Sequence, residues 1–168
     1  MRKGKQSVEL IRINDVSFDK WRRQIAELLD SSVKLNFKDF DAGKSYGDDR
    51  CCIIHEHLKD LSAVVLAAVE QDELYGFIWI HRINRLNKKR LHIAEIAVSS
   101  THQHEGIGSK LLATAEEYAC SNGYDEIDLM VTASNKNAVS FYENADFTTE
   151  RLLMKKHLKG NDPRPKEK

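Results

Sequence analysis

The segment Gln103–Lys110 reads Gln-His-Glu-Gly-Ile-Gly-Ser-Lys and stands directly before an apolar pattern with helical spacing. Gly106 and Gly108 let the backbone approach a ligand closely, because glycine carries no Cβ. The first amide hydrogens of a helix lack intrahelical partners, and the helix dipole is positive at that end. These features favour a phosphate or pyrophosphate site, although a simple tight turn into a helix would use the same residues.

Two other phosphate motifs do not fit this segment. The dinucleotide-binding fingerprint requires a third glycine at the position where Leu111 stands. The P-loop requires Gly-Lys-Ser or Gly-Lys-Thr after four residues that follow its first glycine, whereas here Gly-Ser-Lys follows Gly106 after a single residue.

Candidate metal ligands are scattered along the chain. His102 and His104 flank the glycines, where polar loop residues are common, and His55 and His57 are too close in sequence to share a helical face. The three cysteines contain no Cys-x-x-Cys pair and form no disulfide framework. The sequence therefore predicts no metal site.

Hydrophobic patterning predicts the elements that position these residues. Apolar residues that alternate or run together indicate strands, and those that recur every three or four residues indicate helices. The expected strands are 8–13, 63–69, 75–83, 91–98, 125–132 and 148–157, and the expected helices lie around 21–29, 53–61, 107–119 and 135–145. Residues 36–50 are expected to be loop-rich.

This order of elements predicts a mixed α/β fold. The strand–helix–strand unit at 91–132 should be parallel with a right-handed crossover. Gly123 is expected to end the helix of that unit, because glycine accepts the left-handed conformation. A single domain is expected over 1–158, and residues 159–168, with both prolines of the chain, are expected to form a disordered tail.

Two segments resemble the motifs of one enzyme family. The run Glu95–Val98, the glycine turn and the Leu111-Leu112 helix resemble the acetyl-CoA-binding motif of the GNAT superfamily of N-acetyltransferases. The later run Asn135-x-x-Ala138-x-x-Phe141-Tyr142-Glu143 resembles the second motif of that family. The resemblance covers residues 62–157, and the earlier residues only by element order. It implies a mixed, centrally splayed β-sheet flanked by helices.

Two positions depart from the family pattern. Gln103 stands where arginine is more common in the family, so this position lacks a positive charge. Asp146-Phe147 stands where the family usually has Gly-Phe, and aspartate tolerates a left-handed turn better than most residues.

The resemblance implies acetyl-CoA as cosubstrate and no metal. In such enzymes the pantetheine arm pairs with the backbone of the fourth strand, here Ile96, Ala97 and Val98. Asn135 and Ala138 would also lie at the cofactor, and Asn135 would bind the pantetheine arm, cap its helix, or do both. The pyrophosphate would sit on the amides of Gln103, His104, Glu105, Gly106, Ile107, Gly108 and Ser109.

The resemblance also implies two catalytic side chains. An amine with a pKa of about 10.4 is uncharged in about one molecule per few thousand at neutral pH, so a general base helps. Glu95 would be that base, and the alternative is a carboxylate on the solvent face of a half-buried strand. Tyr142 would donate a proton to the departing thiolate, and the alternative is a core tyrosine.

Other side chains could shape an acceptor site. Tyr75 and Trp79 in the third strand could line a pocket, although core packing is the more common use of such residues. Four acidic residues lie in the expected loop at 36–50, which covers the acceptor site in folds related by the resemblance, and could attract a cationic amine: Asp39, Asp41, Asp48 and Asp49.

Charge composition and the lengths of apolar runs argue against nucleic-acid-binding and membrane-spanning classes of protein. Lysine plus arginine and aspartate plus glutamate each number 26, so no basic excess indicates nucleic-acid binding. The longest apolar run, 63–69, is too short to span a bilayer, and the start of the chain does not resemble a signal peptide. We expect a cytoplasmic protein that does not bind membranes.

The sequence thus predicts an enzyme that moves an acetyl group from acetyl-CoA to a primary amine by direct attack. A small-molecule amine is the favoured acceptor, because no peptide-docking extension is evident. The alternatives are a protein N-terminal or lysine acetyltransferase and a non-catalytic acyl-CoA-binding module. The expected partners are acetyl-CoA and the amine acceptor, with a homodimer left open.

Overall fold

The computed structural model describes residues 8–36, 46–85 and 88–156. The chain divides into two compact units, residues 1–132 and 133–168, and each unit is described by itself. In the first unit the elements are β1 (Glu9–Ile13), α1 (Asp15–Asn36), α2 (Tyr46–Lys59), β2 (Ala63–Glu70), β3 (Glu73–Arg85), β4 (Lys88–Val98), the short 3-10 helix η1 (Ser100–His102), α3 (Ile107–Ser121) and β5 (Glu126–Leu129).

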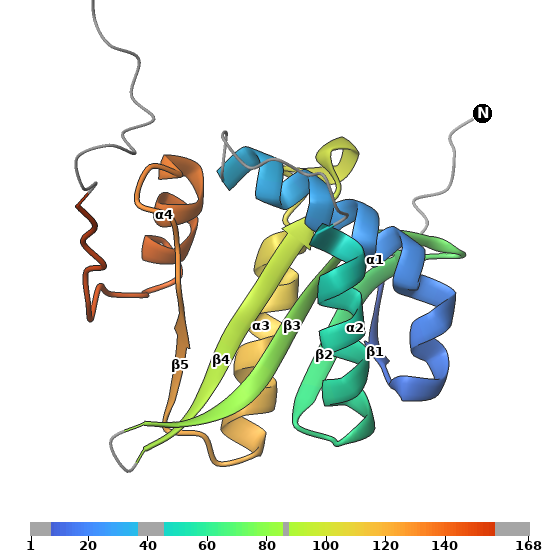
Figure 1. The fold of residues 1–168 in the computed structure, drawn as a ribbon, viewed down its shortest axis with the longest axis horizontal. Coiled ribbons are helices and arrows are strands. Elements are labelled where there is room, and N and C mark those ends of the chain that lie inside the picture. The colour runs from blue at the N-terminus through green and yellow to red at the C-terminus, as the bar shows by residue number, and fades with distance from the viewer. Residues whose placement is uncertain (1–7, 37–45, 86–87, 157–168) are drawn as a thin grey trace, which may run out of the picture. The chain divides into compact units, whose positions relative to one another are not determined.

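The first unit is built on one five-stranded sheet with the order β1-β2-β3-β4-β5 (Figure 1). The first four strands are antiparallel to their neighbours, and β5 is parallel to β4. The predicted mixed α/β fold is therefore confirmed. Five of the six expected strands match elements of this sheet, with shifts of a few residues at their ends.

Helices cover both faces of the sheet. α1 and α2 lie against one face, here called the α1/α2 face, and α3 lies against the other (Figure 1). The start of α1 is capped reciprocally, because Ser17 N donates to Asn14 Oδ1 at 2.8 Å and Asn14 N donates to Ser17 Oγ at 3.0 Å. The core on the α1/α2 face includes Phe18, Trp21, Ile25, Leu29, Ile54, Leu58, Phe77 and Trp79.

A β-bulge interrupts the register between β3 and β4. Trp79 is paired with Glu95, but the next residue, Ile80, is paired with Ile93, so that Ala94 has no opposite residue. Before the bulge, the even-numbered residues of β4 face α1 and α2; after it, the odd-numbered residues do. The bulge thus decides which way the second half of β4 points.

The sheet splays between β4 and β5. The two strands pair over only four positions, from Arg90 opposite Glu126 to Ile93 opposite Leu129. β4 continues to Val98, whereas β5 ends at Leu129. Within the described residues, the second half of β4 therefore has a strand on its β3 side alone. This divergence lies between the fourth and fifth strands, where the family resemblance implied a splay.

The second unit contains one helix, α4 (Lys136–Glu143), among its described residues. The predicted strand at 148–157 is wrong over 148–156, which form no strand, and His157 lies outside the described residues. The segment lacks the alternation that buries one strand face: its three apolar residues are consecutive, and Leu152, Leu153 and Met154 are 80%, 98% and 88% exposed.

The region between α1 and α2 also differs from expectation. The predicted loop-rich stretch 36–50 includes the first turn of α2, which begins at Tyr46. Asp48 and Asp49 supply negative charge to this first turn, where the helix dipole favours it. Asp39, Asp41 and the predicted tail 159–168 lie outside the described residues.

Candidate active site

The glycine turn contains left-handed residues directly before a helix. His104 and Gly106 adopt left-handed backbone conformations, with φ of 66° and 78°, immediately before α3 begins at Ile107. Alternation of left- and right-handed residues curls the backbone so that successive amide groups converge. No side chain caps the start of α3, and a Cβ at Gly106 would meet no atom within 4 Å.

The residues of the predicted cofactor site differ in whether the side chain or only the backbone amide can contact a ligand. Ile107 is 2% exposed, so its side chain anchors the turn in the core and only its amide can face a phosphate. Gly108 and Ser109 lie in the first turn of α3, where amide hydrogens lack intrahelical partners. Gln103, His104, Glu105 and Gly106 are exposed in the turn itself.

The predicted pantetheine strand is the last part of β4. Ile96, Ala97 and Val98 pair with β3 on one side and, within the described residues, with no strand on the other. A Cβ at Gly76 would lie 2.8 Å from the carbonyl oxygen of Ala97, so the glycine permits the close approach of β3. β4 is thus paired with β3 on one edge, and the opposite edge of this part is paired with no strand that the structure describes.

Glu95 points toward α1 and α2 because of the bulge at Ala94. Its carboxylate accepts a hydrogen bond from Tyr46 Oη at 2.8 Å and forms an ion pair with Arg50 Nη2 at 3.1 Å. The side chain of Glu95 is 18% exposed and that of Arg50 is 25% exposed. The carboxylate therefore lies in a partly enclosed, polar position.

Both contacts of the carboxylate are made by one oxygen. Tyr46 and Arg50 bind Oε1 of Glu95, and no described residue binds Oε2. A carboxylate has about four lone-pair positions, so the second oxygen retains its capacity to accept a hydrogen bond or a proton.

The start of α2 places these two partners. Gly47 packs against α1, where a Cβ would lie 2.2 Å from the carbonyl oxygen of Ala26, and Gly47 N donates to Asp30 Oδ1 at 2.7 Å. Tyr46 and Arg50 flank this contact. Burial is the largest cause that raises the pKa of Tyr46 to about 12, with additional contributions from the charge of Glu95 and its hydrogen bond.

Arg50 also lies on an aromatic surface. Its guanidinium carbon is 4.5 Å from the centroid of the Trp79 ring, and Trp79 is 2% exposed. Trp79 is therefore a core residue that supports a cation next to Glu95. Tyr75, the other aromatic candidate of β3, stacks on His102 at 3.7 Å and donates to Glu70 Oε2 at 2.6 Å.

The second motif lies in the second unit. Asn135 caps α4, because its Oδ1 accepts a hydrogen bond from Ala138 N at 3.1 Å. Tyr142 is half-buried between Phe141 and Phe147, with ring centroids 5.1 and 5.7 Å away. Glu95 belongs to the first unit and Tyr142 to the second.

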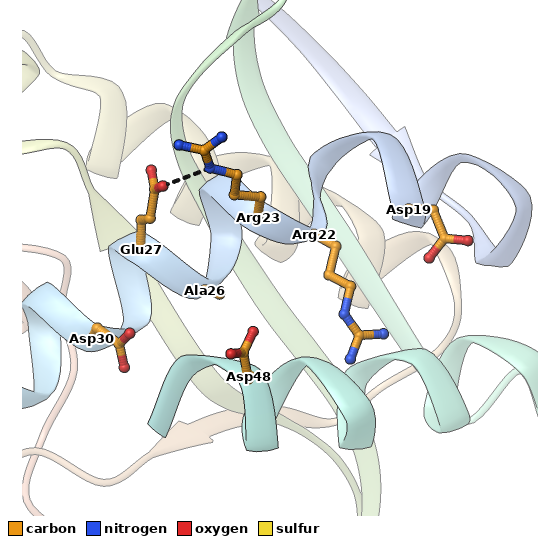
Figure 2. Close-up of a pocket in the computed structure, with 7 residues that line it drawn as sticks. All are labelled: Asp19, Arg22, Arg23, Ala26, Glu27, Asp30 and Asp48. Carbon is orange, nitrogen blue, oxygen red and sulfur yellow. Dashed lines mark hydrogen bonds and ion pairs between the residues drawn. The ribbon is translucent and has the colours of Figure 1, made fainter. Parts of the chain in front are cut away.

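A groove lies apart from Glu95, between the two helices of the α1/α2 face. This groove of about 370 Å³ has a charged lining (Figure 2), in which Glu27 pairs with Arg23 at 3.0 Å. Asp48 is the one predicted acceptor-site residue in its wall. The lining is Asp19, Arg22, Arg23, Ala26, Glu27, Asp30 and Asp48.

The described residues contain no group of three or more histidine, cysteine, aspartate or glutamate side chains arranged to hold a metal ion. None of the helices in the described part of the chain has the length and apolar character needed to cross a bilayer.

Comparison of the sequence with models of protein families identifies the family of this chain. The sequence model described as "Acetyltransferase (GNAT) family" matches residues 24–147. The chain belongs to the GNAT acetyltransferase family. The match includes both motifs, the bulged strand and the start of the second unit.

Curated relatives of this GNAT chain act on different acceptors. It is 29% identical to the mycothiol acetyltransferase of Clavibacter sepedonicus over 129 residues, which are 73% of this chain and 40% of that protein. It is 34% identical to N-alpha-acetyltransferase 30 of Xenopus laevis over 74 residues, 44% of this chain and 27% of that protein. The chain thus spans less than half the length of these relatives.

A shorter relative matches over more of its length. The N-alpha-acetyltransferase of Saccharolobus solfataricus is 29% identical over 118 residues, which cover 64% of this chain and 70% of that protein.

Solved structures show the same fold. An aminoglycoside acetyltransferase from an uncultured soil metagenomic sample superposes with a TM-score of 0.71 at 17% identity, over 95% of this chain and all of that one. A putative acetyl transferase from Pyrococcus furiosus has a TM-score of 0.69 at 27% identity, over 89% of this chain and all of that one.

Four residues near the candidate site were not found from the sequence. Tyr46 and Arg50 stood in a stretch interpreted as loop-rich, and nothing in the pattern linked them to Glu95. His92 and Asp128, described below, face each other only because of the β4–β5 pairing. Recognition of the bulge would have been the signal that places His92 and Glu95 on one face.

Proposed function

We propose that this protein transfers the acetyl group of acetyl-CoA to a primary amine of a small molecule, by direct attack of the amine on the thioester. The observation that carries the proposal is the edge of β4 over Ile96–Val98, which pairs with no strand among the described residues, followed after the short helix η1 by the left-handed turn at the start of α3. An extended ligand that ends in a pyrophosphate could lie with its extended part along the edge of β4 and its pyrophosphate at the turn.

The donor would lie along the splay. Amides of the pantetheine arm would pair with the free edge of β4 at Ile96–Val98, as an added strand. The pyrophosphate would accept hydrogen bonds from the amides of Gln103–Ser109, where the dipole of α3 favours negative charge. This arrangement would bring the thioester to the point where β4 and β5 diverge, close to Glu95.

Glu95 would accept a proton from the acceptor ammonium. Its Oε1 is held by Tyr46 and Arg50, so the position of the carboxylate is fixed before substrate binds. Its Oε2 keeps its lone pairs for the incoming amine. Attack of the neutral amine forms the nitrogen–carbon bond, and collapse of the intermediate breaks the carbon–sulfur bond.

Tyr142 would donate a hydrogen bond or a proton to the departing sulfur. An ordinary phenol has a pKa of about 10 and is protonated at neutral pH, whereas a thiol has a pKa of about 8.5. Full proton transfer is mildly uphill, so most of the benefit would come from a hydrogen bond to the developing negative charge. Asn135 and Ala138 would lie at the cofactor beside it.

A peptide N-terminus is the second candidate acceptor. The match that covers 70% of the Saccharolobus N-alpha-acetyltransferase supports it. A non-catalytic acyl-CoA-binding module is a third candidate function. Catalysis is favoured over it because no described residue binds Oε2 of Glu95. A cytoplasmic location remains part of the proposal.

The test is thiol release from acetyl-CoA in the presence of polyamines, amino acids, aminoglycosides and peptides. Release that depends on a small amine supports the proposal, and release only with peptides favours the second candidate. Tight binding of acetyl-CoA without release to any amine would identify a binding module.

A further inference from the structure

His92 and Asp128 form the last cross-strand pair on the α1/α2 face before the sheet splays. They are directly opposite each other in the parallel β4–β5 ladder. The next pair, Ile93 and Leu129, belongs to the opposite face and ends the ladder. The imidazole thus lies where the proposed binding mode places the thioester.

Asp128 fixes the orientation of this imidazole. Its Oδ1 lies 2.5 Å from His92 Nδ1, and its Oδ2 lies 3.4 Å from Arg90 Nη1. The side chains of His92 and Asp128 are 18% and 20% exposed, and that of Arg90 is 7% exposed. A carboxylate on Nδ1 favours the tautomer with the proton on that nitrogen, which leaves Nε2 as a proton acceptor. No described residue binds Nε2.

The bulge in β4 brings His92 and Glu95 to the same face. A separation of three residues would put them on opposite faces of a regular strand. Because Ala94 has no partner, His92 pairs with His81 and Glu95 pairs with Trp79, and both neighbours face α2. Two proton-accepting groups, His92 and Glu95, therefore lie on the α1/α2 face where β4 and β5 diverge.

The proposed reaction requires two protons to leave the acceptor nitrogen. The first leaves the ammonium ion before attack, and the second leaves the positively charged nitrogen of the tetrahedral intermediate. One proton is supplied to the sulfur from Tyr142, which regains it from solvent, so the net reaction releases one proton. A single carboxylate could take the second proton only after it had discharged the first.

We propose that His92, held by Asp128, takes the second proton from the acceptor nitrogen through Nε2, while Glu95 takes the first. The nitrogen–carbon bond has formed at this stage, and loss of the proton prevents the amine from leaving again, so the carbon–sulfur bond breaks instead. His92 then releases its proton to solvent. This inference rests on the proposed function and adds a proton acceptor to its site.

Several charged or titratable groups lie around His92. The His81 ring centroid is 5.2 Å from that of His92, and burial is the largest cause that lowers the pKa of His81, so two adjacent imidazolium ions are disfavoured. The charged or titratable groups around this pair are Asp128 and Glu126 on β5, Arg90 and Glu95 on β4, and His57 and Arg50 on α2.

The test compares His92→Gln, Asp128→Asn and the control His81→Gln in the full chain, by thiol release as a function of pH. We expect His92→Gln to lower kcat by about a hundredfold or more, with unchanged acetyl-CoA affinity by calorimetry. Asp128→Asn should also lower kcat, because it removes the carboxylate that orients the imidazole. His81→Gln should keep the wild-type rate.

A second measurement separates chemistry from folding. His92→Ala creates space for free imidazole, which should restore part of the lost rate. Wild-type turnover and an unchanged pH profile in His92→Gln would overturn the inference, as would a loss explained entirely by lower thermal stability without rescue. Failure of the wild-type protein to acetylate any amine would overturn the proposed function and this inference with it.

Discussion

Replacement of Glu95 by glutamine tests the proposed base with little change in shape. Glutamine retains an oxygen that can accept the hydrogen bond from Tyr46, but it removes the negative charge that faces Arg50. The ion-pair side chains are 18% and 25% exposed, so we expect a loss of about 1 kcal/mol in the free energy of unfolding. The variant should therefore remain folded.

The catalytic loss should be much larger than the loss of stability. Removal of a general base costs a factor of about 10² to 10⁴. An amine with a pKa of about 10.4 becomes about a hundred times more abundant in its neutral form between about pH 7 and about pH 9. The rate of Glu95→Gln should accordingly rise about tenfold per pH unit over this range. Burial, the largest cause that raises the pKa of Tyr46, remains in this variant, so the phenol continues to donate over this range.

The assay is thiol release at saturating acetyl-CoA, measured across this pH range for wild type, Glu95→Gln and the control Tyr46→Phe. The control removes one hydrogen bond to the carboxylate and leaves its charge, so we expect a loss of less than about tenfold. A Glu95→Gln protein with the wild-type rate at every pH would refute the assignment of the base. A uniform loss without recovery at high pH would indicate a different role.

Three other substitutions test separate parts of the site. Gly108→Glu should abolish acetyl-CoA binding in calorimetry while the protein stays folded, because bulk and negative charge would stand where the pyrophosphate is expected; unchanged affinity would contradict that position. Tyr142→Phe should lower kcat with little change in the KM for acetyl-CoA, and full turnover would make it a core tyrosine. Gly47→Ala should cost about 1–3 kcal/mol in thermal unfolding, because its Cβ would lie 2.2 Å from a backbone oxygen of α1; an unchanged Tm would contradict this packing.

The sequence predicts most of the sheet because burial leaves a clear pattern. β2 (Ala63–Glu70) is almost entirely buried, and its continuous apolar run identifies it without any tertiary information. The apolar stripe of α3 and the glycines at its ends are equally local signals. The segment 148–157 was predicted as a strand on the same grounds, and it fails because a strand also needs a neighbour and a buried face.

The orientation of the candidate site could not be predicted in this way. Glu95 faces α2 because of one unpaired residue at Ala94, and a bulge depends on the register of two strands rather than on local composition. Arg50 and Tyr46 reach Glu95 from a helix 45 and 49 residues away in sequence, by virtue of the close contact at Gly47. Such long-range contacts produce no periodic pattern in the sequence.

Mass spectrometry of the acceptor after incubation with acetyl-CoA tests the central claim most directly. We predict that a small primary amine gains a single acetyl group in the presence of the wild-type protein, and that Gly108→Glu, which should not bind the donor, gives none. Binding of acetyl-CoA to the folded wild-type protein with no acetylated amine or peptide in a broad panel would contradict the claim.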